Sequence, residues 1–69
     1  MEAWVIKRDD GKYFSVASHN YERYWGDVLY CHKFMNREYA DQFFNQEKEI
    51  ANPFFDNTRV VKIRIEEVE

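Results

Sequence analysis

The feature that most restricts the fold is the dipeptide Asp10-Gly11, which lies between two β-prone runs, residues 3–8 and residues 13–17. An Asp-Gly pair in this position is a strong signal for a β-hairpin, because glycine readily takes the positive φ that the turn needs. The sequence therefore predicts a hairpin with Asp10-Gly11 as its two-residue loop.

A two-residue loop also fixes the register of the two strands. One face would carry Arg8 opposite Tyr13, Ile6 opposite Ser15 and Trp4 opposite Ala17. The other face would carry Val5 opposite Val16 and Lys7 opposite Phe14. Apolar side chains would therefore lie on both faces of the hairpin.

Residues 37–49 have the pattern of an amphipathic helix. Asn36 is a suitable N-cap, and Glu38 and Asp41 place negative charge in the first turns. Asn52-Pro53 ends the helix, because proline moves the preceding residue out of the α region. The apolar face consists of Tyr39, Ala40, Phe43, Phe44 and Ile50, of which the first four are expected in the core.

Three other segments complete the prediction. Residues 18–27 show neither helical nor strand periodicity and are interpreted as an aromatic loop, whereas residues 28–34 predict a third strand. Residues 58–68 predict the final strand, with Val61, Ile63 and Ile65 on a buried face and Lys62, Arg64 and Glu66 on a polar outer face. The acidic residues 66–69 are expected to fray.

The order is β-β-(β)-α-β within one domain, residues 1–69. We expect an α+β fold, a three- to four-stranded, mostly antiparallel sheet with one helix packed on one face. The final strand could pair with the first. Either the aromatic loop or another element must then cover the second face of the sheet.

The core must be built largely from rings, because aromatic residues make up 19% of the chain and leucine occurs once, at Leu29. A net charge of -3 excludes a general nucleic-acid binder and a strongly acidic DNA mimic. Cys31 is a single cysteine, which excludes an internal disulfide and favours a cytoplasmic location. No apolar run or basic N-terminal region indicates a membrane span or a secretory signal.

Four segments of the chain form a pattern together: Trp4-Val5-Ile6-Lys7, Asp9-Asp10-Gly11-Lys12-Tyr13, Phe34-x-Asn36-Arg37-Glu38 and Val60-Val61-Lys62-Ile63. This pattern resembles a group of short proteins encoded by temperate phages and prophages of staphylococci and related low-GC Gram-positive bacteria. The group brings no established activity and no site residues to this chain. The resemblance implies a small accessory protein that binds a host or rival protein.

No constellation for catalysis or metal binding emerges from the sequence. Cys31 and His32 are neighbours that would point to opposite faces of a strand, so they form neither a zinc site nor a catalytic pair. Turn formation explains Asp9 and Asp10, and no glycine-rich loop could hold a phosphate. We therefore expect no catalytic residue, metal or cofactor, and we expect the protein not to be an enzyme.

Protein binding fits the aromatic loop best, because Tyr, Trp and Arg are enriched at interface hot spots. The candidate partner-binding residues are Tyr21, Arg23, Tyr24 and Trp25, then Trp4 and Tyr13. The partner would be a bacterial or mobile-element protein that this chain modulates. Three alternatives stay open: the same rings form a second small core, they stack on single-stranded nucleic acid, or a homodimer hides the second sheet face.

Overall fold

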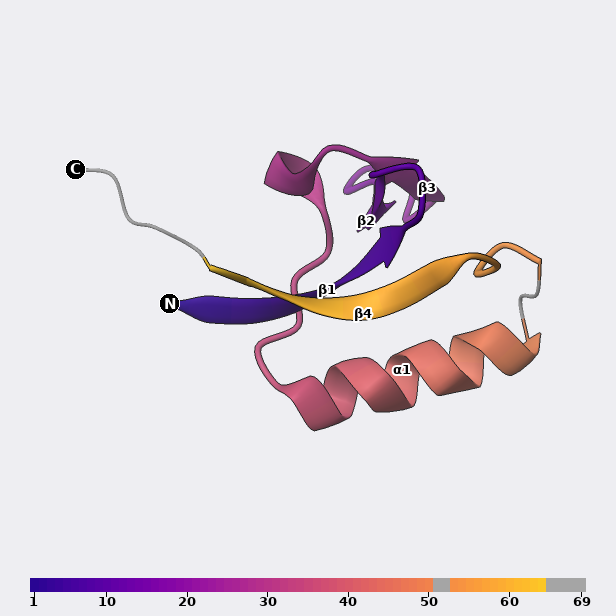
Figure 1. Ribbon diagram of the computed structural model, residues 1–69. Helices are drawn as coiled ribbons and strands as arrows, with labels where there is room; N and C mark the ends of the chain where they lie inside the picture. Colours follow the sequence, from indigo (N-terminus) through magenta and orange to yellow (C-terminus); the bar gives the residue numbers. More distant parts are fainter. Residues whose placement is uncertain (51–52, 65–69) are drawn as a thin grey trace.

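Four antiparallel strands and one long helix make up the fold (Figure 1). The computed structural model describes residues 1–50 and 53–64. The elements are β1 (Glu2–Arg8), β2 (Tyr13–Val16), β3 (Arg23–Gly26), the short 3-10 helix η1 (Val28–Tyr30), α1 (Arg37–Ile50) and β4 (Thr58–Arg64). The sheet order is β3-β2-β1-β4, and α1 packs on one face. The predicted α+β architecture is confirmed.

The final strand pairs with the first, which the sequence left as one possibility, from Glu2 opposite Arg64 to Arg8 opposite Thr58. Val60 lies opposite Ile6 on the face that packs against α1. Val61 therefore lies on the far face, opposite Val5, and is half-buried there. Lys62 and Arg64 are exposed and Val61 and Ile63 are half-buried, as expected. Val61 and Ile63 lie on the face away from α1, however, so the expectation that this outer face of β4 is polar is wrong.

The β1–β2 turn differs from the prediction by one residue. The register places Lys7, not Arg8, opposite Tyr13. The loop has three residues, because the Gly11 amide donates to the Arg8 carbonyl (2.9 Å) and the Arg8 amide donates to the Lys12 carbonyl (2.7 Å). Gly11 has the positive φ, 90°. The extra residue exchanges the two faces of β2, so Phe14 joins Ile6 in the core under α1.

The predicted third strand over residues 28–34 is wrong, and the strand β3 lies instead inside the segment interpreted as a loop. Asp27 caps η1, since its carboxylate accepts from the Leu29 amide (3.2 Å). The chain then runs extended between β1 and β2. There the His32 amide donates to the Phe14 carbonyl (2.9 Å), and Trp4 and Phe34 exchange two backbone hydrogen bonds of 2.8 Å.

The helix begins where the sequence predicts. The side-chain oxygen of Asn36 accepts from the Tyr39 amide (3.2 Å), which confirms the N-cap. Ala40 is fully buried, but Tyr39 is 62% exposed, so the expectation that Tyr39 belongs to the core is wrong. The predicted stop at Asn52 falls outside the described residues.

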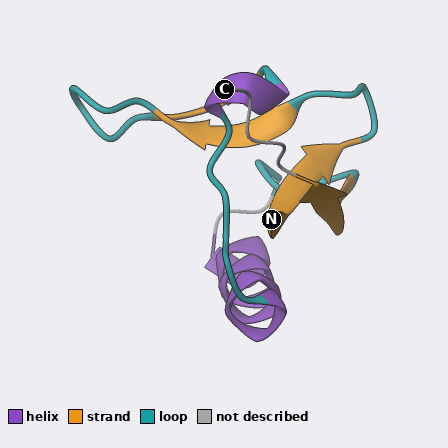
Figure 2. Ribbon diagram, turned by 90° about the vertical axis from the view of Figure 1, so that its left-hand side faces the viewer, coloured by secondary structure: helices purple, strands orange, loops and turns teal. Residues whose placement is uncertain are grey.

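Aromatic side chains form the core between α1 and the sheet. Its buried members are Ile6, Phe14, Phe34, Ala40 and Phe55. Trp4 and Ile6 face α1, so Ala3 and Val5, which alternate with them along β1, lie on the second face of the sheet. Ala3 and Val5 have no exposed surface, so this second face is also covered. Figures 1 and 2 show η1 on the side of β1 opposite α1, so η1 and the chain after it take the place expected for the aromatic loop.

The Phe14 ring contacts several other aromatic rings of the core, so its removal should destabilise the whole domain. Phe14→Ala is expected to lower the free energy of unfolding by about 3–5 kcal/mol, which would leave much of the protein unfolded. Urea denaturation followed by near-UV circular dichroism measures this. Leu29→Ala is the control, because Leu29 is 73% exposed and should change stability little. A Phe14→Ala midpoint equal to the control's would contradict this account of the core.

Candidate functional site

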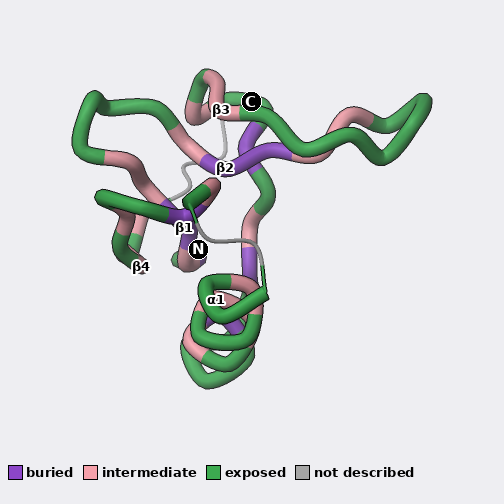
Figure 3. The backbone as a smooth tube through the Cα atoms, turned by 90° about the vertical axis from the view of Figure 1, so that its right-hand side faces the viewer, coloured by how far each residue is buried: buried purple, intermediate pink, exposed green. Residues whose placement is uncertain are grey.

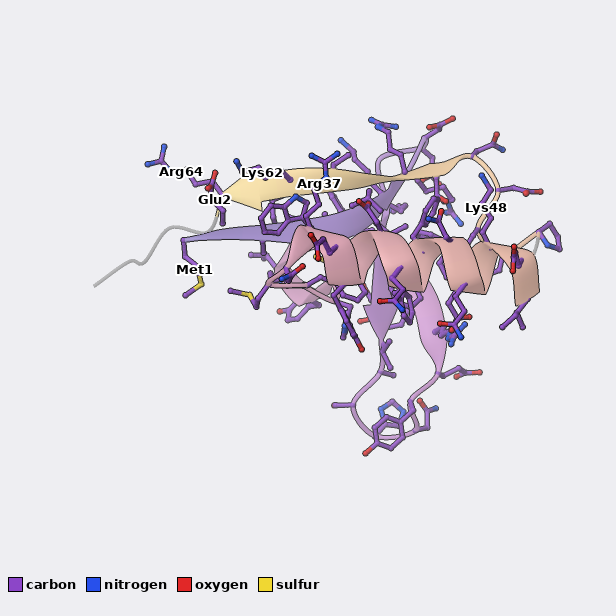
Figure 4. The ribbon with its side chains drawn as sticks, turned by 90° about the horizontal axis from the view of Figure 1, so that it is seen from below. Met1, Glu2, Arg37, Lys48, Lys62 and Arg64 are labelled. Carbon is purple, nitrogen blue, oxygen red and sulfur yellow. The ribbon has the colours of Figure 1, made fainter. Side chains whose placement is uncertain are left out.

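The β2–β3 hairpin projects from the body of the molecule (Figures 2 and 3). Residues 17–22, here called the hairpin tip, join the two strands and are exposed except for the half-buried Ala17. Figure 4 shows the tip on the side of the molecule away from β4. The hairpin thus presents a group of side chains clear of the sheet and of α1.

Backbone and side-chain hydrogen bonds define the conformation of the tip. The Ala17 amide donates to the Glu22 carbonyl (2.8 Å), and the Tyr21 amide donates to the Ala17 carbonyl (2.9 Å). The side chain of Asn20 accepts from the Glu22 amide (3.0 Å) and donates to the Glu22 carboxylate (3.3 Å). These bonds close a four-residue loop over residues 18–21.

Tyr21 occupies the strained position of this loop. Its φ is 57°, in the left-handed region that bulky side chains rarely adopt, and its side chain is 80% exposed. At the other non-glycine position with positive φ among the described residues, the sequence has Asn57, a residue type that tolerates this conformation. At positive φ a tyrosine therefore costs more conformational free energy than an asparagine does, and the exposed side chain of Tyr21 makes few packing contacts.

The two strands of the hairpin separate the predicted site residues onto opposite faces. Trp25 lies opposite Phe14, and Arg23 lies opposite Val16, on the face that packs toward the core. Tyr24 lies opposite Ser15 on the other face, together with the pair Tyr13 and Gly26. Because side chains alternate along a strand, Tyr24 and Trp25 cannot contribute to one continuous surface.

Trp25 packs into the aromatic core. Its ring centroid lies 6.0 Å from that of Phe14, 5.2 Å from that of Phe54 and 5.9 Å from that of Phe55. The Arg8 guanidinium lies 5.0 Å from its ring centroid. This geometry gives Trp25 a structural role and corresponds to the core alternative that the sequence left open.

Arg23 ties the hairpin to the helix. Its guanidinium donates two hydrogen bonds, of 2.7 and 2.9 Å, to the carboxylate of Glu47 on α1. Hydrogen bonding in this pair raises the pKa of Arg23 and lowers the pKa of Glu47. The bidentate geometry fixes the angle of the hairpin against α1. Because Arg23 and Val16 form the last strand pair before the tip, this ion pair attaches the tip end of the hairpin to α1.

The other three predicted residues differ in exposure. Tyr24 is 40% exposed, and its ring lies over Gly26, where an added Cβ would come within 2.8 Å of a ring carbon. Trp4 is half-buried against the core. Tyr13 is also half-buried, with the Lys7 ammonium 5.6 Å from its ring centroid. The structure thus leaves Tyr21 and Tyr24 as the exposed rings of the predicted set.

The β2–β3 hairpin itself was not predicted from the sequence. Ser18, His19 and Asn20 are small or polar residues typical of a turn. Bulky residues occupy both faces of β3, so polar and apolar residues do not alternate along this segment. The turn signal before it was therefore not connected with a strand.

Cys31 is buried, whereas its neighbour His32 is exposed. Burial raises the pKa of the Cys31 thiol, which makes the thiolate scarce at neutral pH. The His32 ring contacts the Phe34 ring edge-on, with centroids 4.6 Å apart. No group of three or more His, Cys, Asp or Glu residues within residues 1–50 and 53–64 could hold a metal ion.

A shallow hollow on α1, of about 120 Å³, is lined by Tyr39, Gln42, Phe43 and Gln46. It is well below the roughly 300–1,000 Å³ of typical small-molecule sites, and no titratable acid or base lines it apart from the Tyr39 phenol. The hollow therefore offers little for binding or transforming a small substrate.

Comparison with protein-family models, curated proteins and solved structures finds no match to this chain. None of the helices in the described part of the chain combines the length and apolar character needed to cross a bilayer. The interpretation of the site therefore depends on its geometry.

His32 is expected to make stability depend on pH. Partial burial, and then the nearby Lys33 charge, lower its pKa below the ordinary 6.5. As pH falls below that value the unfolded chain binds a proton first, so the free energy of unfolding decreases. His32→Gln should reduce this decrease between about pH 7 and pH 5 in urea titrations. A His32→Gln protein whose free energy of unfolding falls with pH as steeply as that of the wild type would contradict the assignment.

Proposed function

We propose that this protein is a non-catalytic binding module that attaches to another protein through the tip of its β2–β3 hairpin. The observation that carries the proposal is the exposed, strained Tyr21 on a projecting hairpin. Strained backbone positions tend to occur at functional sites, because a residue that costs stability there needs another reason to be present. A tyrosine also supplies a large, rigid contact surface of the kind found at interface hot spots.

The way in which the hairpin strands are attached supports the same proposal. Trp25 and Arg23 anchor the strands to the core and to α1, so the tip is held at a fixed angle before any partner arrives. A preorganised loop loses less conformational entropy on binding than a mobile one. Tyr24, on the outer face of the same hairpin, would extend the contact surface below the tip.

The charges at the tip favour a protein over nucleic acid as the partner. Glu22 contributes a carboxylate to the tip, and the nearest guanidinium, that of Arg23, is already paired with Glu47. A single-strand binder would need free cations beside its stacking rings to meet phosphates. The resemblance to small phage proteins suggests that the partner is a bacterial or mobile-element protein in the cytoplasm.

The variant Tyr21→Asn separates binding from folding. Asparagine tolerates positive φ, so this variant should be more stable by about 1 kcal/mol, a rise in melting temperature of about 4–8 °C. It should nevertheless lose the partner that the wild-type protein retains from a nuclease-treated lysate of a low-GC Gram-positive bacterium. Calorimetry and a tagged pull-down read by mass spectrometry measure the two effects.

Tyr30→Asn is the matched control, because Tyr30 is 73% exposed but lies in η1, away from the hairpin tip. It should retain the same partner. A Tyr21→Asn protein that still captures this partner, or that melts at a lower temperature than wild type, would contradict the proposal. A partner whose retention falls steeply with salt would favour the nucleic-acid alternative instead.

A further inference from the structure

β3 is an edge strand of the sheet, on the side opposite β4 (Figure 3). Its inner edge pairs with β2, and no strand within residues 1–50 and 53–64 pairs with its outer edge. An open edge presents unpaired backbone donors and acceptors, to which another extended segment can add. The pairing of β3 with β2 determines which of its backbone groups point outward.

The outward-pointing groups belong to Arg23 and Trp25. In an antiparallel pair, opposed residues alternate between those that exchange hydrogen bonds and those whose N–H and C=O point away from each other. The Ala17 amide donates to the Glu22 carbonyl (2.8 Å), so these two residues are of the first kind. Arg23, the next residue of β3, is therefore of the second kind, and so is Trp25.

The hydrogen bond of Phe14 agrees with this alternation. Phe14 lies opposite Trp25, and its carbonyl accepts from the His32 amide (2.9 Å), which lies between β1 and β2. Within the described part of the chain, no hydrogen bond reaches the backbone N–H or C=O of Arg23 or Trp25. Each of these residues contributes one donor and one acceptor, so the edge offers the alternating groups that one antiparallel strand satisfies.

The two edges of the sheet differ in their protection. Proteins commonly discourage edge pairing with exposed charged side chains, lysine above all. The exposed side chains of β4 are all basic: Arg59, Lys62 and Arg64. The one charged residue of β3 is Arg23, whose guanidinium is turned to Glu47 on α1. The outer edge of β3 is therefore the less protected of the two.

Carboxylates stand at both ends of β3. Glu22 precedes the strand and Asp27 follows it, and both are exposed. Neither forms an ion pair with another described residue. Glu22 is two residues from Tyr24 and therefore lies on the same face of the hairpin, the one away from the core. A segment that adds to this edge thus meets a carboxylate next to an exposed ring.

We propose that the partner of the hairpin adds an extended segment to the outer edge of β3, antiparallel to it, with a lysine or arginine facing Glu22 and a bulky apolar side chain facing Tyr24. This inference rests on the proposed function, because it assigns a binding mode and a partner chemistry to the same hairpin. The added segment would bond to Arg23 and Trp25.

The geometry of the added strand specifies a sequence pattern in the partner. Tyr24 would belong to a pair that exchanges no hydrogen bonds with the added strand, and side chains lie closest in such pairs. Aromatic rings there pair favourably with aromatic or β-branched side chains, and opposite charges pair favourably on the same face. Because the added strand is antiparallel, its basic residue comes two positions after its apolar residue. The residues on either side of the apolar one bond to β3 and cannot be proline.

Selection of short random peptides from a displayed library against the immobilised full-length protein tests this pattern. The enriched peptides should have a lysine or arginine two positions after a bulky apolar residue and no proline next to that apolar residue. The absence of any enriched peptide, or enrichment of peptides without this pattern, overturns the inference.

Amide hydrogen exchange with the strongest of these peptides, made synthetically, locates the binding site. In the free protein the Arg23 and Trp25 amides should exchange rapidly, because nothing in the described chain protects them. With the peptide at about ten times its dissociation constant, both should exchange about tenfold more slowly. The Glu38 amide is the control, because first-turn helix amides lack intrahelical partners and α1 should not contact the peptide. Unchanged exchange at Arg23 and Trp25 overturns the inference.

A reciprocal exchange of charge tests the contact with Glu22. Glu22→Lys should bind the selected peptide about fivefold more weakly. It should regain affinity for a peptide in which glutamate replaces the basic residue. Glu49→Lys, which makes the same charge change at an exposed position of α1, is the matched control and should bind the original peptide like the wild type. Circular dichroism checks that both variants are folded, and equal affinities of the two variants for the original peptide overturn the inference.

The variant Tyr21→Asn separates this inference from the proposed function. Peptides that lose affinity for Tyr21→Asn but leave the Arg23 and Trp25 amides unprotected bind the tip alone, which overturns the edge pairing and supports the proposed function. Peptides that protect both amides and bind Tyr21→Asn as tightly as the wild type support the edge pairing and contradict the role of Tyr21.

Discussion

The ring of Phe14 is the contact on which the rest of the structure depends. It lies on β2 and meets aromatic rings from four other segments of the core: Trp25 on β3, His32 in the connection after η1, Phe43 on α1, and Phe54 and Phe55 before β4. The backbone of the same residue accepts from the His32 amide. In a small domain with a single leucine, this ring cluster supplies the burial that aliphatic side chains provide in most cores.

The same cluster explains why the hairpin is firm at its base and free at its tip. Alternation along β3 directs Trp25 toward Phe14 and leaves Tyr24 on the other face. The Arg23 to Glu47 ion pair adds a second attachment, to α1. Beyond it, the tip has its own hydrogen bonds but no ring contact with the core, and Tyr21 remains exposed. Core packing thus positions the side chain of Tyr21, which itself lies outside the core.

The sequence predicted the elements whose signals are local. Asn36 identified the start of α1, and the alternation in residues 58–68 identified β4, whose pairing with β1 the sequence left as one possibility. The β1–β2 register could not be predicted, because Asp10-Gly11 suits both a two-residue turn and the three-residue loop with a glycine bulge that the protein adopts. β3 was missed because rings on both of its faces conceal the period of two. The candidate site residues were expected on one surface for the same reason. Without the strand β3 and its register against β2, the sequence did not show that Trp25 faces the core and Tyr24 the opposite side.

Native-state hydrogen exchange tests most directly whether one ring cluster holds both the hairpin and the body of the sheet. The account predicts that the His32 amide, bonded to Phe14, exchanges with the same free energy as the Trp4 and Phe34 amides, through global unfolding. The Tyr21 amide at the tip should exchange at a lower free energy. If His32 instead exchanges well below Trp4 and Phe34, together with Tyr21, the hairpin opens as a separate unit, and Phe14 does not have the central role assigned to it.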